Sequence, residues 1–189
     1  MKMKMTKTGA RLSAICLAVA SLMSVSHATF AADDSATINV TATVKDNTCT
    51  PGWDTNGTTV DLGNLNGAHL TAKGAEVGKK SFTLALKECG KGAKTVKVTA
   101  AGTADSSDAD GFAVDSGDGA ATGVDVYLYA TGSDGKEVAL KPDGSNSVEE
   151  SIAQGDSTLN FAASVKQSSD TAITTGSINS NVTLNMDYE

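Results

Sequence analysis

The chain has 189 residues, of which 40% are hydrophobic, and its 22 acidic and 15 basic side chains give a net charge of −7. This length is typical of one domain, and the hydrophobic fraction excludes an intrinsically disordered chain. The excess of acidic side chains argues against nucleic-acid binding, because an acidic protein cannot neutralise phosphates.

The first 31 residues have the organisation of a secretory signal peptide. Four basic residues precede an apolar run at residues 12–23, and small residues follow this run up to Ala31. The apolar run is too short to span a bilayer, so we expect export and removal of the segment, after Ala31 or after Ala28. Cleavage after Ala31 removes the four basic residues and leaves 158 residues with a net charge of −11.

Both ends of the exported chain alternate apolar and polar residues. The apolar positions of the first run, which lies just behind the cleavage site, are Ala36, Ile38, Val40, Ala42 and Val44. The last run, within residues 176–189, carries Ile178, Val182, Leu184, Met186 and Tyr188 on one face. Period-two alternation predicts half-buried β-strands. Two pairings remain open: the terminal strands close the domain by pairing with each other, or one of them pairs with another chain.

Short alternating runs separated by turn signals fill the middle of the chain. They predict strands at residues 58–62, 81–89, 94–101, 112–114, 123–130, 136–140 and 157–166. A helical period is absent after the signal peptide, and Gly-, Asp- and Asn-rich turns separate the runs. The pattern predicts an all-β, antiparallel sandwich of immunoglobulin-like size.

Two cysteines remain after export, Cys49 and Cys89. In an oxidising compartment an isolated pair is most simply one disulfide. Such a bond closes a loop of about 40 residues and stabilises the fold by about 4 kcal/mol in the chain-entropy model. A two-cysteine metal site lacks further ligands, because His69 is the single histidine of the exported chain.

Catalytic and cofactor sites are poorly supported by the sequence. A nucleophile–histidine pair would have to use His69, which we expect to be a solvated loop residue. The acidic stretch at residues 105–111 looks like a calcium loop, but Gly117 occupies the twelfth position, where calcium needs a bidentate carboxylate. We therefore predict a solvated loop there, and neither an enzyme nor a metal or cofactor site.

The two ends and the cysteines resemble the chaperone–usher pilins, the type 1 fimbrial subunit family. That family has an aromatic residue one before the end and a glycine fourteenth from the end, as Tyr188 and Gly176 are here. It has a disulfide between its first and third strands, where Cys49 and Cys89 lie, and an alternating extension before the first cysteine. Residues 46–49 (Asp-Asn-Thr-Cys) also look like the small adaptor subunits, and Ala42 stands where the family often has glycine.

The resemblance implies an incomplete immunoglobulin-like sandwich, at residues 46–189, that a donor strand from a neighbouring subunit completes. The donor would be the extension at residues 32–45, with Ala36, Ile38, Val40, Ala42 and Val44 facing the groove. Gly176, Val182, Leu184, Met186 and Tyr188 would form the strand that the periplasmic chaperone and later the neighbour contact. The implied protein is a shaft or adaptor subunit of a cell-surface fimbria, exported through the periplasm, assembled at an outer-membrane usher and contributing to adhesion, with a host receptor contacted only indirectly.

Another class of function stays open: a single-domain tip adhesin or a secreted β-sandwich that binds a ligand. A closed sandwich of that kind would be a stable monomer, whereas an open one would aggregate, swap strands or need a chaperone.

Overall fold

The computed structural model describes residues 48–54 and 56–189, which all belong to one compact unit. The expected signal peptide (residues 1–31) and donor extension (residues 32–45), with Ala36, Ile38, Val40, Ala42 and Val44, lie outside the described residues. The division of the chain into extension and pilin domain therefore remains a prediction.

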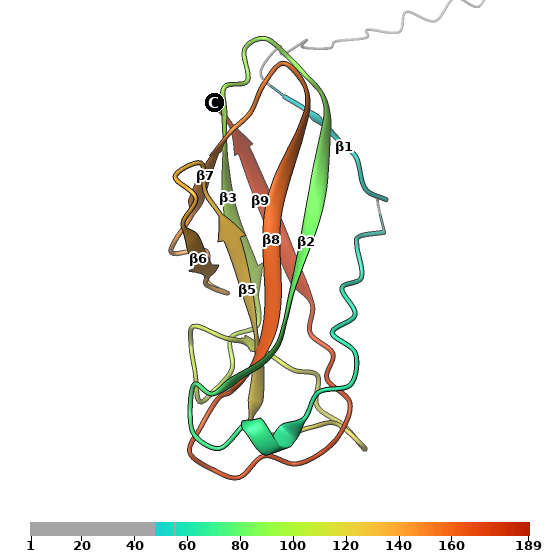
Figure 1. The fold of residues 1–189 in the computed structure, drawn as a ribbon, viewed down its shortest axis with the longest axis vertical. Helices are drawn as coiled ribbons and strands as arrows, with labels where there is room; N and C mark the ends of the chain where they lie inside the picture. Colours follow the sequence, from blue (N-terminus) through green and yellow to red (C-terminus); the bar gives the residue numbers. More distant parts are fainter. Residues whose placement is uncertain (1–47, 55) are drawn as a thin grey trace, which may run out of the picture. The chain divides into compact units, whose positions relative to one another are not determined.

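The described residues form two antiparallel β-sheets (Figure 1). The larger sheet has the order β1 (Thr50–Pro51), β2 (Glu76–Cys89), β8 (Gly155–Gln167), β5 (Val124–Thr131), β4 (Phe112–Ala113), and β6 (Glu137–Leu140) also pairs with β5. The smaller sheet has the order β7 (Val148–Ser151), β3 (Thr95–Gly102), β9 (Val182–Tyr188). One short 3-10 helix, η1 (Gly67–His69), precedes β2. None of the described residues lies in a helix long and apolar enough to cross a membrane.

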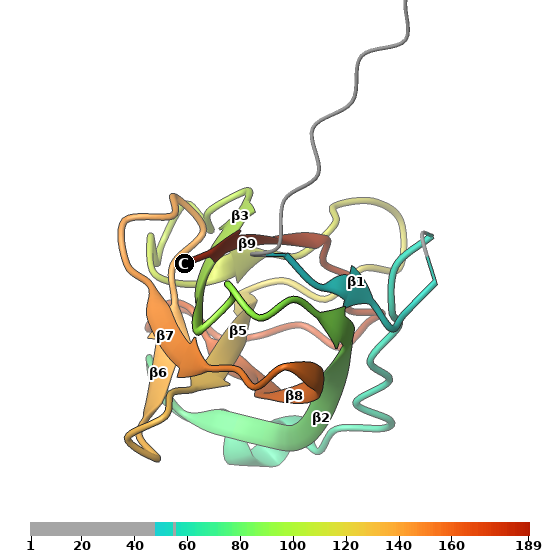
Figure 2. The same cartoon turned by 90° about the horizontal axis from the view of Figure 1, so that it is seen from above.

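The sheets pack face to face because their strands alternate apolar and polar side chains. In β3, Val96, Val98 and Ala100 are buried while the residues between them are partly exposed. Their counterparts on the larger sheet include Leu86 of β2 and Leu159 of β8, both fully buried. Figure 2 shows β3 and β9 on one side of this core and β2 and β8 on the other. Burying one such side chain contributes about 1.5–3 kcal/mol.

The predicted all-β sandwich is confirmed, and most of the predicted strands are present within a few residues of their expected bounds. Four expectations were wrong. Residues 58–62 are not in a strand, the last strand begins at Val182 rather than near Ile178, and both β1 and β7 were missed. β7 carries Val148 as its single buried residue, so it has no alternating pattern and is a strand because it pairs with β3.

The disulfide between Cys49 and Cys89 is present. It joins the start of the described chain to the end of β2, and Cys89 is buried in the core. The two-residue strand β1 pairs beside it with Leu86 and Lys87, and Gly52 N donates to Ala85 O at 2.8 Å. The disulfide and β1 together fix the segment that follows them along the side of the sandwich.

Candidate functional site: an open groove beside the last strand

A groove of about 1080 Å³ runs between the two sheets on the side where residues 53–65 and β9 lie. Val182, Leu184 and Met186 of β9 form one wall, and the opposite wall comes from the segment between β1 and η1, seen beside β2 in Figure 1. The floor is apolar and comes from three strands of the larger sheet; it consists of Phe82, Leu84, Val126, Leu128, Ala163 and Val165. The groove thus has an apolar floor between two walls of different origin.

Among the described residues, β9 is an edge strand of the smaller sheet and pairs with β3 alone. Glu189 and Thr95 exchange both backbone hydrogen bonds, N to O at 2.9 and 3.0 Å, so they form a hydrogen-bonded pair. Such pairs alternate along an antiparallel ladder. With Tyr188 opposite Val96 and Val182 opposite Gly102, the odd-numbered residues of β9 bond to β3. The backbone N–H and C=O groups of Val182, Leu184, Met186 and Tyr188 therefore point away from β3, along the free edge.

The side chains of the same four residues lie on the inner face. Each is half-buried, whereas Thr183, Asn185 and Asp187 between them are exposed. Tyr188 also packs against the main core, and its burial raises the pKa of the phenol. β9 thus presents unpaired backbone groups and apolar side chains at the same positions, with a repeat of about 7 Å.

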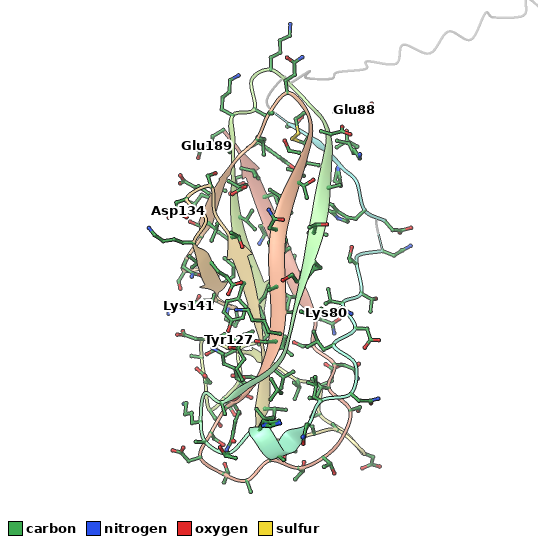
Figure 3. The ribbon with its side chains drawn as sticks, in the orientation of Figure 1. Lys80, Glu88, Tyr127, Asp134, Lys141 and Glu189 are labelled. Carbon is green, nitrogen blue, oxygen red and sulfur yellow. A yellow bond between two sulfur atoms is a disulfide. The ribbon has the colours of Figure 1, made fainter. Side chains whose placement is uncertain are left out.

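The opposite wall, as far as the structure describes the chain, is not paired as a strand. Residues 58–65 make no backbone–backbone hydrogen bond to another described residue. Val60 and Leu62 are half-buried against the core, Leu65 packs on Gly78, and Lys80 Nζ donates to Asp61 O at 2.6 Å (Figure 3). Residues 58–62 therefore alternate like a strand without forming one: Val60 and Leu62 are half-buried, but no strand among the described residues pairs with this segment.

Gly176 lies at the far end of the groove, before β9. A Cβ atom at this position would lie 2.4 Å from Ala120 C and from Ala121 N, so only glycine fits. This contact lets Ser177 pair with the loop before β5: Ser177 N donates to Gly119 O at 2.8 Å, and Ala121 N donates to Ser177 O at 2.9 Å. The paired segment sets the direction in which the chain enters β9.

The structure thus places four of the C-terminal residues singled out by the sequence, Gly176, Val182, Leu184 and Met186, in the lining of the groove. Tyr188 shares their face of β9 but packs on the main core and does not line the groove. Sequence reasoning missed the second wall and the floor, above all Trp53, Val60 and Phe82, because these residues belong to separate strands and segments. His69 is exposed on η1. Within the part of the chain that the structure describes, no cluster of three or more metal-ligating side chains occurs.

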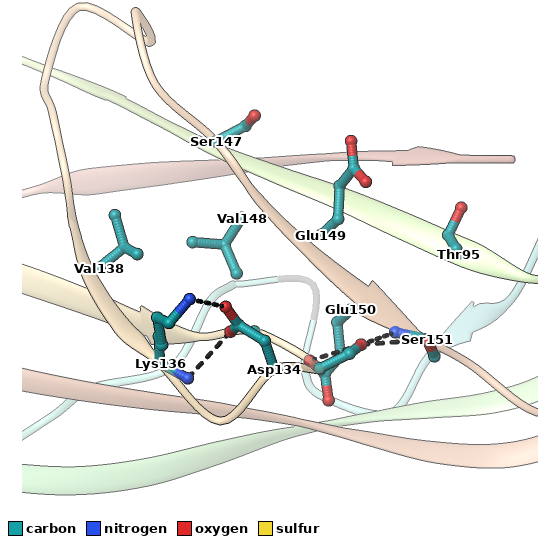
Figure 4. A pocket seen from close by; sticks show the side chains of 11 residues that line it. Thr95, Asp134, Lys136, Val138, Ser147, Val148, Glu149, Glu150 and Ser151 are labelled. Atoms are coloured by element: carbon teal, nitrogen blue, oxygen red, sulfur yellow. Dashed lines mark hydrogen bonds and ion pairs between the residues drawn. The ribbon is translucent and has the colours of Figure 1, made fainter.

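A second hollow, of about 420 Å³, lies between β6 and β7 (Figure 4). Several of its polar side chains are paired with one another. Asp134 forms an ion pair with Lys136 at 3.0 Å, and Ser133 Oγ forms hydrogen bonds with Glu150 and Ser151. It is shallow and lacks an apolar floor comparable to that of the groove, so the groove is the candidate site.

Comparison with known proteins agrees with this geometry. The family model for fimbrial proteins matches residues 38–189. The chain is 33% identical to a type 1 fimbrial subunit of Salmonella typhimurium over 181 residues, covering 90% of this chain and 95% of the relative. It is 30% identical to long polar fimbria protein A of the same species, covering 93% and 96%.

Solved structures share the fold. The P pilus rod subunit PapA is similar with a TM-score of 0.59 and 24% identity, covering 75% of this chain and 99% of PapA. A subunit of a chaperone–usher pilus, solved in work on rod uncoiling, is similar with a TM-score of 0.61 and 23% identity, covering 84% and 98%. Family, relatives and fold lead to the same conclusion: the chain belongs to the fimbrial protein family and is a structural subunit of a fimbria.

Proposed function

We propose that this fimbrial subunit polymerises by donor-strand exchange, in which its groove accepts the N-terminal extension of a neighbouring subunit. The observation that carries the proposal is the free edge of β9, where unpaired backbone groups and apolar side chains coincide along an apolar groove. Strand addition of this kind obtains affinity from backbone hydrogen bonds and specificity from alternate side chains.

The extension has the chemistry that the groove requires. Ala36, Ile38, Val40, Ala42 and Val44 recur every second residue, the same period as the groove-facing residues of β9. Laid along β9, the extension would pair with the backbone of Val182, Leu184, Met186 and Tyr188 and direct its five apolar side chains at the floor. Burial of each contributes roughly 1–3 kcal/mol before the cost of ordering the extension is subtracted.

The same surface explains a need for partners before assembly. An unpaired edge beside apolar side chains that are only half-buried is an aggregation hazard. A periplasmic chaperone that lends a strand to the groove would remove this hazard, and exchange for the next subunit's extension would take place at the outer-membrane usher. In this scheme the subunit passes through the periplasm, ends in a cell-surface fimbria, and supports adhesion without contacting the host receptor itself.

Deletion of residues 33–44 tests the proposal. The truncated subunit keeps its groove but has no donor strand, so it should bind chaperone or a synthetic peptide of residues 33–45 and fail to polymerise. Trp53, the single tryptophan of the chain, lines the groove, so its fluorescence reports peptide binding directly. Electron microscopy and size-exclusion chromatography report polymerisation.

Two peptide variants provide the matched control. Ile38→Lys places a charge on the apolar face and should abolish binding, whereas Thr37→Lys places it on the polar face and should have little effect. End-to-end assembly of the truncated subunit, or equal binding of both peptides, would show that the donor strand is assigned wrongly.

A further inference from the structure

Asp125 on β5 is a buried carboxyl group on the side of the larger sheet that faces away from the groove. Its neighbours Val124 and Val126 line the groove, so the alternation of the strand directs Asp125 to the opposite face. Its exposed fraction is 0%, and neither carboxyl oxygen accepts a hydrogen bond from another described residue. A buried carboxylate without donors is costly, so the proton-bound form is favoured.

An acidic loop covers this carboxyl group. Residues 103–113, the acidic loop, are closed by backbone bonds from Ala113 N to Thr103 O at 2.8 Å and from Asp105 N to Gly111 O at 2.9 Å. Gly111 lies directly on Asp125: a Cβ atom on Gly111 would lie 2.0 Å from Asp125 Oδ2. The loop is held to β5 by Tyr127, whose hydroxyl donates to Asp108 Oδ2 at 2.9 Å (Tyr127 is labelled in Figure 3).

The charges around Asp125 are mostly of its own sign. Asp108 and Asp105 face it from the acidic loop, and Lys166 faces it from the adjacent position on β8. The Lys166 ammonium lies 3.6 Å over the ring of Tyr127, and it makes no hydrogen bond to Asp125. Burial, with the charges of Asp108 and Asp105, raises the pKa of Asp125 to about 7.

The acidic loop is also bonded to the end of the groove. Its last residue, Ala113, pairs with Asp125 across β4 and β5, and Ser180 Oγ donates to Ala113 O at 2.8 Å. Just beyond the loop, Asp115 N donates to Asn179 O at 2.8 Å. Asn179 and Ser180 line the groove immediately before β9. These two bonds therefore connect the acidic loop and the residue after it to the groove wall.

We propose that Asp125 and the acidic loop form a pH-responsive latch, closed when Asp125 is protonated and loosened when it ionises, that controls the order of residues 177–181 at the groove end. The effect of this latch on donor binding rests on the proposed function; the latch itself does not.

The direction of the pH dependence follows from linkage. The folded state binds the Asp125 proton more tightly than the unfolded state, so this residue's contribution to stability is most favourable below about pH 4. That contribution is lost as pH rises through about 7. We expect the acidic loop to be destabilised first. Local opening of this loop separates ionised Asp125 from Asp105 and Asp108 and relieves their repulsion without unfolding the core.

Amide hydrogen exchange followed by mass spectrometry tests the latch. The full exported chain, isolated in its native assembly, is compared at pH 5.5 and pH 8 after correction for the intrinsic exchange rate. We expect protection of residues 103–113 to fall by about tenfold at the higher pH, and protection of residues 177–181 to fall with it. Asp125→Asn should abolish both changes, because it removes the titrating group.

Two further variants separate the latch from a general charge effect. Asp118→Asn, an exposed acid outside the acidic loop, should leave the native pH response unchanged. Asp108→Asn removes a facing charge while its amide oxygen can still accept from Tyr127, so the midpoint of the transition should move to lower pH. The latch would be overturned if protection fell equally in the native chain and in Asp125→Asn. It would also be overturned if Asp108→Asn left the midpoint of the pH transition unchanged. A response confined to residues 103–113 would overturn its coupling to the groove.

Discussion

At the scale of single residues, glycine at position 176 is required by the backbone that it touches. The atoms that a Cβ would meet at 2.4 Å belong to the main chain of Ala120 and Ala121, which cannot rotate away as a side chain can. Any larger residue must push the segment before β9 off the loop before β5. The sequence marked Gly176 only through its distance from the end of the chain, and the structure supplies the physical reason.

Gly176→Ala should destabilise the subunit by about 1–3 kcal/mol, the range for overpacking a rigid contact. Chemical denaturation of the subunit, with a donor peptide bound, measures the loss. Gly67→Ala is the control, because its Cβ would meet only the flexible end of Ile173, at 3.0 Å. A loss no larger than that of the control would mean that the loop before β5 yields easily.

Asp125 shows what residue patterns miss. Residues 123–130 alternate, and an aspartate between two valines looks like the solvent face of a half-buried strand. Its burial depends on the acidic loop, which the sequence predicted to be solvated. Several of that loop's residues are indeed exposed, but Gly111 is buried on Asp125. Local periodicity cannot show that a remote loop covers the outer face of a sheet.

At the scale of elements, the two walls of the groove differ in secondary structure although their sequence patterns are alike. β9 and residues 58–62 both alternate apolar and polar residues, yet only β9 is a strand. The difference is the partner: β9 has β3 beside it, whereas no strand of the described part of the chain pairs with residues 58–62. A sequence pattern predicts which face of a segment is buried, whereas strand formation also depends on a neighbour.

Leu184→Ala tests the β9 wall. The side chain of Leu184 is half-buried and lines the groove, so its truncation should weaken binding of the residue 33–45 peptide by about 1–3 kcal/mol, or roughly 5–150-fold. Titration monitored by Trp53 fluorescence gives the dissociation constants. Asn185→Ala alters the adjacent, exposed side chain and should bind like the native subunit. If both variants bind equally well, the donor does not contact the inner face of β9.

At the scale of the whole molecule, the disulfide anchors a wall whose residues 58–65 pair with no strand of the described chain. Cys49 and Cys89 hold the start of residues 50–65 to β2, and beyond Gly57 that segment is held by packing and a few side-chain bonds to the rest of the described chain. The pairing and the two-sheet sandwich could both be predicted from the sequence, because they follow from export, cysteine count and alternation. The groove could not, since its floor comes from three strands whose order in the sheet no single run reveals.

Replacing both cysteines, Cys49→Ala with Cys89→Ala, should lower the free energy of unfolding by about 4 kcal/mol, as expected for a loop of about 40 residues. Denaturation of the double variant is compared with that of the native subunit before and after reduction. The reduced native subunit should match the double variant, and both should bind the donor peptide more weakly because their second wall is less fixed. Unchanged stability would show that packing of Val60 and Leu62 alone holds this wall.

The free edge of β9 has a consequence for symmetry. In the proposed donor-strand exchange, the donor segment at one end of the chain and the acceptor edge at the other would be different surfaces, so the contact between them would be heterologous rather than two-fold. Such contacts leave one unused surface at each end of any open assembly, however many copies it contains. A fibre built this way has a direction: its two tips are chemically distinct, one presenting an empty groove and the other an unplaced strand, so growth and termination need different partners at each tip.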